Sequence, residues 1–187
     1  MKVAPKKHPE VVHTTVRAGK PERAPQPSSE PLNQPIPRVL FLCRGNDARS
    51  QMAEAILRQF SGGRVAAYSA GQSPAPVHPL AVGVMRRHSV DITRQRSKHV
   101  NEFQGQAFNL VITLLDDNRE TCSPVPGVSQ AVCWNFPDPA AVEGDEETRQ
   151  QAFQTTAQEL MTRIRLLLLV LEKTARDSQE TSRAHPR

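Results

Sequence analysis

The sequence predicts a single α/β domain in three layers, a four-stranded parallel sheet with helices on both faces. Three observations predict this class. Short apolar runs alternate with helical patterns between residues 38 and 171, the first run leads directly into a polar loop, and the domain closes on a long amphipathic pattern. At 187 residues, the chain can bury one sizeable core but is too short for two full domains.

The predicted elements follow one another as strand, helix, strand, helix. The strands are short apolar runs, as expected for strands that are buried on both faces of a parallel sheet. They cover residues 38–43, 65–69, 109–114 and 131–134. Helices are predicted over residues 50–60 and 79–88 and in the closing segment, where apolar residues recur at steps of three and four. These residues are Phe153, Ala157, Leu160, Met161, Ile164, Leu167, Leu168 and Leu171.

Both ends of the chain are predicted to be disordered, which leaves residues 38–175 as the folded domain. Residues 1–37 contain eight of the sixteen prolines and no aromatic residue. They therefore cannot bury enough apolar surface to offset the entropy lost on ordering. Residues 176–187 are expected to form a second disordered tail.

The net charge of +5 is concentrated in these two tails. Residues 1–37 carry six Lys or Arg against three Asp or Glu, and residues 176–187 carry three against two, which leaves +1 for the domain. Nucleic-acid binding by the domain is therefore not expected. A basic cluster within it is interpreted as a solvated face, and consists of Arg94, Arg96, Lys98 and His99.

The three cysteines, Cys43, Cys122 and Cys133, are an odd count and form no dense framework. This favours a reducing compartment such as the cytoplasm over a disulfide scaffold. Cys133 lies in an apolar strand and is expected in the core. No metal-ligand spacing is present, so neither a metal nor a bound cofactor is predicted. The longest strongly apolar run, residues 166–171, is far shorter than the roughly 20 residues that span a membrane, so no membrane association is expected.

The stretch VLFLCRGNDARS, residues 39–50, contains the candidate site. Ligands of parallel α/β sheets bind beyond the carboxyl ends of the strands, which is where Cys43 is predicted to lie. The loop N–H groups and the dipole of the next helix can form a nest for an oxyanion, and Arg49 can hold two of its oxygens. The Ser50 hydroxyl can donate to the sulfur, which favours the thiolate. The predicted oxyanion-binding residues are Arg44, Gly45, Asn46, Asp47, Ala48, Arg49 and Ser50.

This C-x5-R-S pattern between a strand and a helix resembles the low-molecular-weight protein tyrosine phosphatase fold and, within it, the thiol-dependent arsenate reductases. The resemblance covers residues 38–173 and rests on CRGNDARSQMAEA, YSAG, VHPLAV, VDI, VITL and FPDPAA. It implies that Cys43 is the nucleophile and Arg49 the oxyanion clamp. It also implies that Asn46 fixes the shape of the loop and that Ser50 donates to the thiolate.

Expulsion of an oxygen leaving group requires a proton donor opposite the nucleophile. Asp138, which lies between two prolines in FPDPAA, matches the Asp-Pro acid of the family. Asp116 and Asp117 are weaker candidates and are expected to cap the segment after the third strand. Tyrosine phosphatases of this fold usually have aromatic residues just after Asp-Pro, whereas this chain has Ala140 and Ala141. A phosphotyrosine ring would gain little burial there, which favours a small oxyanion such as arsenate.

Two features depart from the reductase pattern. The resemblance implies a relay of three thiols, but Leu115 occupies the position of the second, while Cys122 matches the third. Leucine cannot attack a sulfur, so three alternatives stay open: Cys122 reaches Cys43 directly, an external thiol resolves the adduct, or the protein does not reduce arsenate. The second departure is Asp47, whose carboxylate is expected to point away from the nest, because it would otherwise repel a bound anion.

The predicted function is arsenate reduction, with attack of Cys43 on arsenate, protonation of the departing water by Asp138, and release of arsenite by a thiol. Thioredoxin, glutaredoxin with glutathione, or mycothiol would supply that thiol, so a redoxin is an expected partner beside the small oxyanion. The alternative is a phosphomonoester or protein tyrosine phosphatase that forms a cysteinyl-phosphate on the same residues. A third reading is an inactive oxyanion-binding module.

Overall fold

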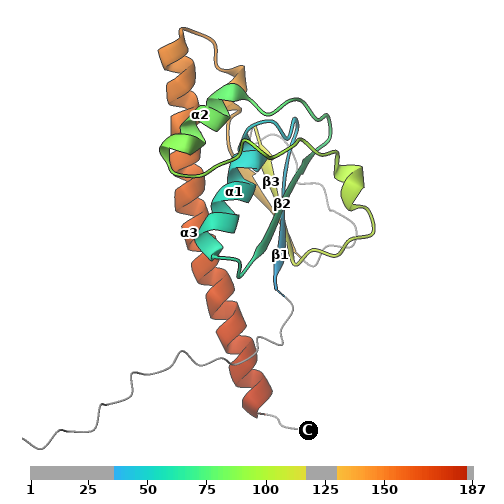
Figure 1. Cartoon of the computed structure of the whole chain (residues 1–187). Helices are drawn as coiled ribbons and strands as arrows, with labels where there is room; N and C mark the ends of the chain where they lie inside the picture. The colour runs from blue at the N-terminus through green and yellow to red at the C-terminus, as the bar shows by residue number, and fades with distance from the viewer. Residues whose placement is uncertain (1–35, 117–129, 185–187) are drawn as a thin grey trace, which may run out of the picture. The chain divides into compact units, whose positions relative to one another are not determined.

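A four-stranded parallel sheet forms the centre of the structure, which is a computed structural model that describes residues 36–116 and 130–184 (Figure 1). The strands are β1 (Arg38–Cys43), β2 (Ala66–Gly71), β3 (Leu110–Leu115) and β4 (Ala131–Asn135). Their order across the sheet is β2-β1-β3-β4, and all three pairings are parallel. The predicted four-stranded parallel sheet is confirmed, and the first strand of the chain lies inside it, between β2 and β3.

Three α-helices pack on one face of this sheet. They are α1 (Arg49–Ser61), α2 (Pro79–Arg87) and α3 (Glu146–Ala184). Their apolar residues join those of β1 and β3 that point to the same side in one hydrophobic core. His78 caps α2 by accepting a hydrogen bond from the backbone N–H of Leu80 through Nδ1 at 3.1 Å, and Pro79 occupies the first helical position, where its missing N–H costs nothing.

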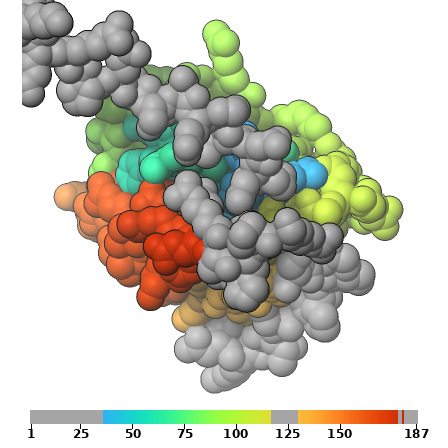
Figure 2. Space-filling view, turned by 90° about the horizontal axis from the view of Figure 1, so that it is seen from below, coloured from blue at the N-terminus to red at the C-terminus, as the bar shows by residue number. Residues whose placement is uncertain are grey.

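The opposite face carries a smaller cluster of apolar and aromatic residues. Its centre is Leu40, Phe108 and Val111, against which Tyr68 and Phe103 pack. In the described part of the chain this face is covered by the single-turn helix η1 (Val100–Phe103) and its flanking segments, rather than by an α-helix. Figure 2 shows α3 in orange and red on one side of the domain and the yellow-green residues around η1 on the other. Helices were predicted on both faces, but residues 93–109 lack the apolar periodicity of a helix that could cover a sheet.

The long closing helix α3 carries the predicted apolar stripe. Phe153, Leu160 and Ile164 are fully buried against the sheet and α1, whereas Leu166 and Leu169 on the outer face are about 60% exposed. No helix within the described residues is long and apolar enough to cross a membrane, although α3 has 39 residues.

The ends of the chain were predicted to be tails over residues 1–37 and 176–187. Most of the first range lies outside the described residues, which begin at Ile36. At the other end the prediction is wrong for residues 176–184, because α3 continues to Ala184. Residues 172–184 contain neither proline nor glycine, so nothing in the sequence stops the helix after its apolar stripe ends.

Candidate active site

The candidate site is the loop that joins β1 to α1 at the carboxyl end of the sheet. β1 ends at Cys43 and α1 begins at Arg49, so the five intervening residues form one tight turn. Gly71, which pairs with Cys43 at the end of β2, lies directly beneath it. A Cβ atom at Gly71 would lie only 2.7 Å from the carbonyl oxygen of Arg44 and 2.8 Å from the backbone nitrogen of Asn46. Glycine is therefore required there by the close approach of two backbones.

Cys43 is a free thiol that is 5% exposed at the base of this loop. Its Sγ lies 2.9 Å from the hydroxyl oxygen of Ser50 in the first turn of α1. The backbone N–H of Asn46 donates to the same sulfur at 3.2 Å. Two hydrogen-bond donors can thus converge on Sγ, an arrangement that stabilises a thiolate.

Asn46 holds the loop in its conformation. Its backbone is in the left-handed region, with φ of 44°, which non-glycine residues rarely adopt and asparagine tolerates better than most. Its side-chain amide donates to the hydroxyl oxygens of Ser50 and Ser69, both at 2.9 Å. Its side-chain oxygen accepts from the backbone N–H of Lys98 at 2.8 Å. The fully buried Asn46 side chain therefore ties the loop to β2 and to the segment before η1.

The first turn of α1 is left open for an anion. Ala48 precedes the helix and provides no side-chain cap, and the first turn contains no acidic residue. Free N–H groups at a helix N-terminus, together with the helix dipole, bind anions. On the outer part of the loop Arg44 is exposed, and the carboxylate of Asp47 lies against Gly45, where an added Cβ would lie 2.5 Å from Oδ1.

Arg49 is the first residue of α1, and its side chain is 2% exposed. Nη1 donates to the carbonyl oxygen of Phe136 at 2.9 Å and also to the carboxylate of Asp116. Nη2 lies 3.2 Å from the Oδ2 atom of Asp138. The structure thus brings Asp138, which is far along the sequence, into contact with Arg49 of the Cys43 loop. Asp116, a weaker acid candidate that was expected to cap the segment after β3, also contacts Arg49.

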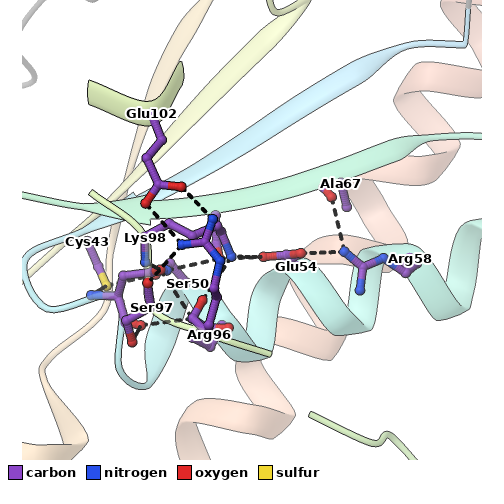
Figure 3. A network of polar contacts seen from close by, with 12 residues as sticks. Cys43, Ser50, Glu54, Arg58, Ala67, Arg96, Ser97, Lys98 and Glu102 are labelled. Carbon is purple, nitrogen blue, oxygen red and sulfur yellow. Dashed lines mark hydrogen bonds and ion pairs between the residues drawn. The ribbon is translucent and has the colours of Figure 1, made fainter. Parts of the chain in front are cut away.

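A buried ion pair between Glu54 and Lys98 lies next to the loop (Figure 3). Glu54 on α1 accepts from the hydroxyl of Ser69, and its carboxylate lies 3.2 Å from the Nζ atom of Lys98. Arg58, one turn later, pairs with the same carboxylate. The Glu54 and Lys98 side chains are 7% and 13% exposed, so Lys98 does not belong to a solvated face as predicted. Sequence reasoning missed this pair, because its members are 44 residues apart.

The rest of the predicted basic cluster matches the prediction only in part. Arg94 and Arg96 are exposed, whereas His99 is half-buried. Arg96 donates to the carboxylate of Glu102 at 3.0 Å, and this hydrogen bond lowers the pKa of the Glu102 carboxyl below its usual 4.5. The backbone carbonyl of Arg96 accepts from the Nζ of Lys98 at 3.2 Å, which joins this surface pair to the buried network.

The other predicted thiol positions lie at the end of β3 and in β4. Leu115 is the last residue of β3. Cys133 lies in β4, where it pairs with Thr113 of β3. Val132 and Trp134 pack into the same core as Cys43, so Cys133 between them points to the opposite face of the sheet. Cys133 is half-buried, not fully in the core. Cys122 lies outside the described residues.

The segment after β4 forms the rim beside Arg49. Asp138 precedes the short helix η2 (Pro139–Ala141), and its Oδ1 atom accepts from the backbone N–H of Ala140 at 3.1 Å. Ala140 and Ala141 are exposed and carry only methyl groups, so this segment builds no aromatic wall. Within residues 36–116 and 130–184, no three His, Cys, Asp or Glu side chains are placed to hold a metal ion.

Comparisons with known proteins agree with this geometry. Residues 38–179 match the family model described as low molecular weight phosphotyrosine protein phosphatase. An arsenate reductase from Halalkalibacterium halodurans is 35% identical over 127 residues, which are 68% of this chain and 91% of the relative.

Solved structures give the same result. A structure described as an arsenate reductase in the phosphate binding state superposes with a TM-score of 0.61 at 25% identity, over 72% of this chain and 98% of that protein. The Corynebacterium glutamicum thioredoxin-dependent arsenate reductase superposes with a TM-score of 0.59 at 29% identity, over 76% of this chain and 65% of that protein.

Proposed function

The chain belongs to the low molecular weight phosphotyrosine protein phosphatase family, and on this premise we propose that it is a thiol-dependent arsenate reductase. The observation that carries the proposal is Cys43, whose Sγ lies 2.9 Å from Ser50 Oγ beneath an uncapped helix N-terminus. A nucleophilic sulfur is thereby aimed at a bound anion. The relative and the two solved structures named above are described as arsenate reductases.

In the first step, the loop N–H groups and Arg49 hold arsenate above the sulfur. The Cys43 thiolate attacks arsenic and forms a sulfur–arsenic bond, while one arsenic–oxygen bond breaks. Asp138 gives its proton to the departing oxygen, which leaves as water. In the structure Asp138 contacts Arg49 at 3.2 Å, within reach of any oxygen that Arg49 binds.

In the second step, a thiol attacks the sulfur of Cys43. A disulfide forms between the two sulfurs, and the electron pair of the sulfur–arsenic bond stays on arsenic, which leaves as arsenite. Arsenic is thereby reduced by two electrons and the two thiols are oxidised. A further thiol then reduces the disulfide and restores Cys43. The reaction requires a reducing compartment, which we take to be the cytoplasm.

The thiol of the second step is proposed to come from outside the folded core. Leu115 stands at the end of β3 and Cys133 faces away from Cys43, so neither position can supply it. Thioredoxin, glutaredoxin with glutathione, or mycothiol would then attack Cys43 directly. The remaining internal candidate is Cys122, and its part in the reaction is decided by experiment.

Phosphomonoester hydrolysis is the second candidate function. Leu115 at the usual thiol position favours it, because a cysteinyl-phosphate needs only water for its release. The exposed Ala140 and Ala141 oppose a phosphotyrosine substrate, since an aromatic ring would find no wall to pack against.

The deciding experiment is a turnover assay on the full chain. Arsenate is offered with thioredoxin and its reductase, with glutathione and glutaredoxin, or with mycothiol and its redoxin, and p-nitrophenyl phosphate serves as the phosphatase substrate. We expect arsenite formation with at least one thiol system and its loss in Cys43→Ser. If arsenate is inert in all three systems while the aryl phosphate is hydrolysed, the reductase proposal is wrong.

Cys122→Ser identifies the source of the second thiol. Turnover with thioredoxin that is lost in Cys122→Ser would establish an internal two-thiol relay. Turnover that is unchanged in Cys122→Ser would establish direct attack by the external thiol.

A further inference from the structure

Asp116 is a charged residue of the site to which the proposed reaction gives no role. It follows directly on β3, which ends at Leu115, and its side chain is 39% exposed. Its carboxylate binds Nη1 of Arg49, a guanidinium that is itself 2% exposed. A buried guanidinium is costly unless its donors are satisfied, so the partners of Arg49 determine how the group is turned.

The donors of Arg49 show which edge of the guanidinium is used. Nη1 has two N–H groups, and it contacts two acceptors, the carbonyl oxygen of Phe136 at 2.9 Å and the carboxylate of Asp116. Nη1 is thereby saturated. Nη2 contacts the carboxylate of Asp138, and among the described residues the N–H group of Nε has no hydrogen-bond acceptor. The edge formed by Nε and Nη2 is the fork that can hold two oxygens of an oxyanion.

We infer that Asp116 is a positioning residue, which saturates Nη1 and so turns the Nε and Nη2 edge of Arg49 toward the oxyanion loop. Phe136 directly follows β4 and Asp116 directly follows β3. The guanidinium is therefore held by residues at the ends of two neighbouring strands. Without Asp116, Arg49 would keep one acceptor on Nη1 and could rotate about it. A guanidinium that is misaligned by about 1 Å loses much of its effect on a bound anion.

This role differs from that of a competitor. If the carboxylate of Asp116 occupied the place of a substrate oxygen, its removal would tighten the binding of anions. If Asp116 positions Arg49, its removal weakens anion binding, and an isosteric acceptor at position 116 recovers most of the loss. Asp116→Asn supplies that acceptor through its amide oxygen and removes the charge, whereas Asp116→Ala removes both.

The test measures two properties of the full-length reduced protein. The first is the dissociation constant of inorganic phosphate by titration calorimetry. The second is the rate at which Cys43 is alkylated by iodoacetate relative to neutral iodoacetamide, read by mass spectrometry of the Cys43 peptide. The ratio of the two rates reports anion capture beside the sulfur, and an altered fold or thiol reactivity alone would change both rates together.

Asp116→Ala is expected to weaken phosphate binding about tenfold and to lower the iodoacetate preference by a similar factor. Asp116→Asn is expected to recover most of both losses. Asp91→Asn is the matched control and should leave both values at the wild-type level. Asp91 is an exposed aspartate whose side chain forms hydrogen bonds only with Thr93 among the described residues.

Phosphate binding in Asp116→Ala that equals or exceeds that of the wild type would overturn the inference. An equal loss in Asp116→Asn would also overturn it, because charge rather than an acceptor for Nη1 would then be required. If Asp116→Ala does not fold, the Asn variant decides alone. The inference rests on the proposed site but not on its turnover. A protein that fails to reduce arsenate can still pass this test, because neither measurement needs a reductant or arsenate.

Discussion

At the scale of single residues, one buried asparagine connects the nucleophile to the fold. Asn46 donates to Ser50, which contacts Cys43, and to Ser69, which donates to Glu54. Glu54 in turn pairs with Lys98. The hydroxyl next to the sulfur is therefore oriented by a chain of hydrogen bonds that ends in an ion pair, and not by the loop alone.

Substitution of Asn46 should separate the role of its side chain from that of its backbone. Asn46→Gly keeps the left-handed backbone but removes the hydrogen bonds that the side-chain amide donates to Ser50 and Ser69. Turnover should therefore fall about 100-fold. Asn46→Ala should lose a similar factor and be less stable than the glycine variant by about 1 kcal/mol, because alanine is strained at φ of 44°. Steady-state kinetics and urea denaturation measure the two effects. Full turnover in Asn46→Gly would show that the amide is not needed.

The residues around the sulfur were largely predictable, and their partners were not. Cys43, Arg49 and Ser50 lie within eight residues, so their proximity follows from one strand-to-helix turn. The contacts of Arg49 with Asp116 and of Glu54 with Lys98 depend on which strand lies beside which. Hydrophobic periodicity and composition do not encode the order of the strands in the sheet, so these contacts could be found only from the folded structure.

At the scale of elements, α3 shows how a periodic pattern becomes a buried face. Leu160 is fully buried, while Leu169, on the same helix, is 60% exposed. Leu160→Ala should lower the free energy of unfolding by about 3 kcal/mol, because it leaves a cavity in the core. The same change at Leu169 should stay within about 0.5 kcal/mol. Urea unfolding followed by circular dichroism compares the two variants, and equal losses would mean that α3 does not pack as described.

The start of α3 depends on a carboxylate. Asp145 precedes the helix, and its side chain accepts a hydrogen bond from the backbone N–H of Thr148 at 2.8 Å. Hydrogen bonding by the Thr148 side chain and, to a smaller extent, by this N–H group lowers the pKa of Asp145 below its usual 3.8. A carboxyl group whose pKa is lower in the folded than in the unfolded state stabilises the fold at any pH above its unfolded-state pKa. This stabilisation is lost as the pH falls through the folded-state pKa.

Asp145→Ala should therefore lower the unfolding temperature at pH 7, and its difference from the wild type should shrink as the pH falls below 3.8. Thermal unfolding between pH 7 and pH 2.5 tests this expectation. A difference that is independent of pH would show that the capping carboxylate is not responsible. Glu143→Ala, a nearby exposed acid outside the helix, is the matched control.

The element boundaries were predicted less well than the elements. All four strands and three α-helices fall where apolar runs and periodicity place them, with ends that differ by at most two residues for all elements except α3. The exception extends well beyond its apolar stripe in both directions, from Glu146 to Ala184. Its last turns follow from the absence of helix-breaking residues, which the hydrophobic pattern does not report.

At the scale of the whole molecule, the sheet, the core and the site lie within residues 36–184. The match to the family model begins at residue 38. Deletion of residues 1–35 should therefore leave both the unfolding temperature and the turnover unchanged. Differential scanning calorimetry and the arsenate assay on the shortened chain measure this. A loss of turnover without a loss of stability would instead assign residues 1–35 a part in the reaction.

The position of β1 inside the sheet has a consequence for the folding kinetics. All strand pairs are parallel, so each requires a long crossover, and the backbone of Arg38 bonds to the side chain of Asn109, 71 residues further along the chain. Contacts of such high separation form slowly, since the entropy of loop closure is lost before they contribute. The loop after β1 is tied to β2 through Ser69 and Gly71, so we expect it to acquire its final shape only after β2 has paired with β1. The capacity to bind an oxyanion is therefore among the last properties that a refolding chain regains, later than its helices.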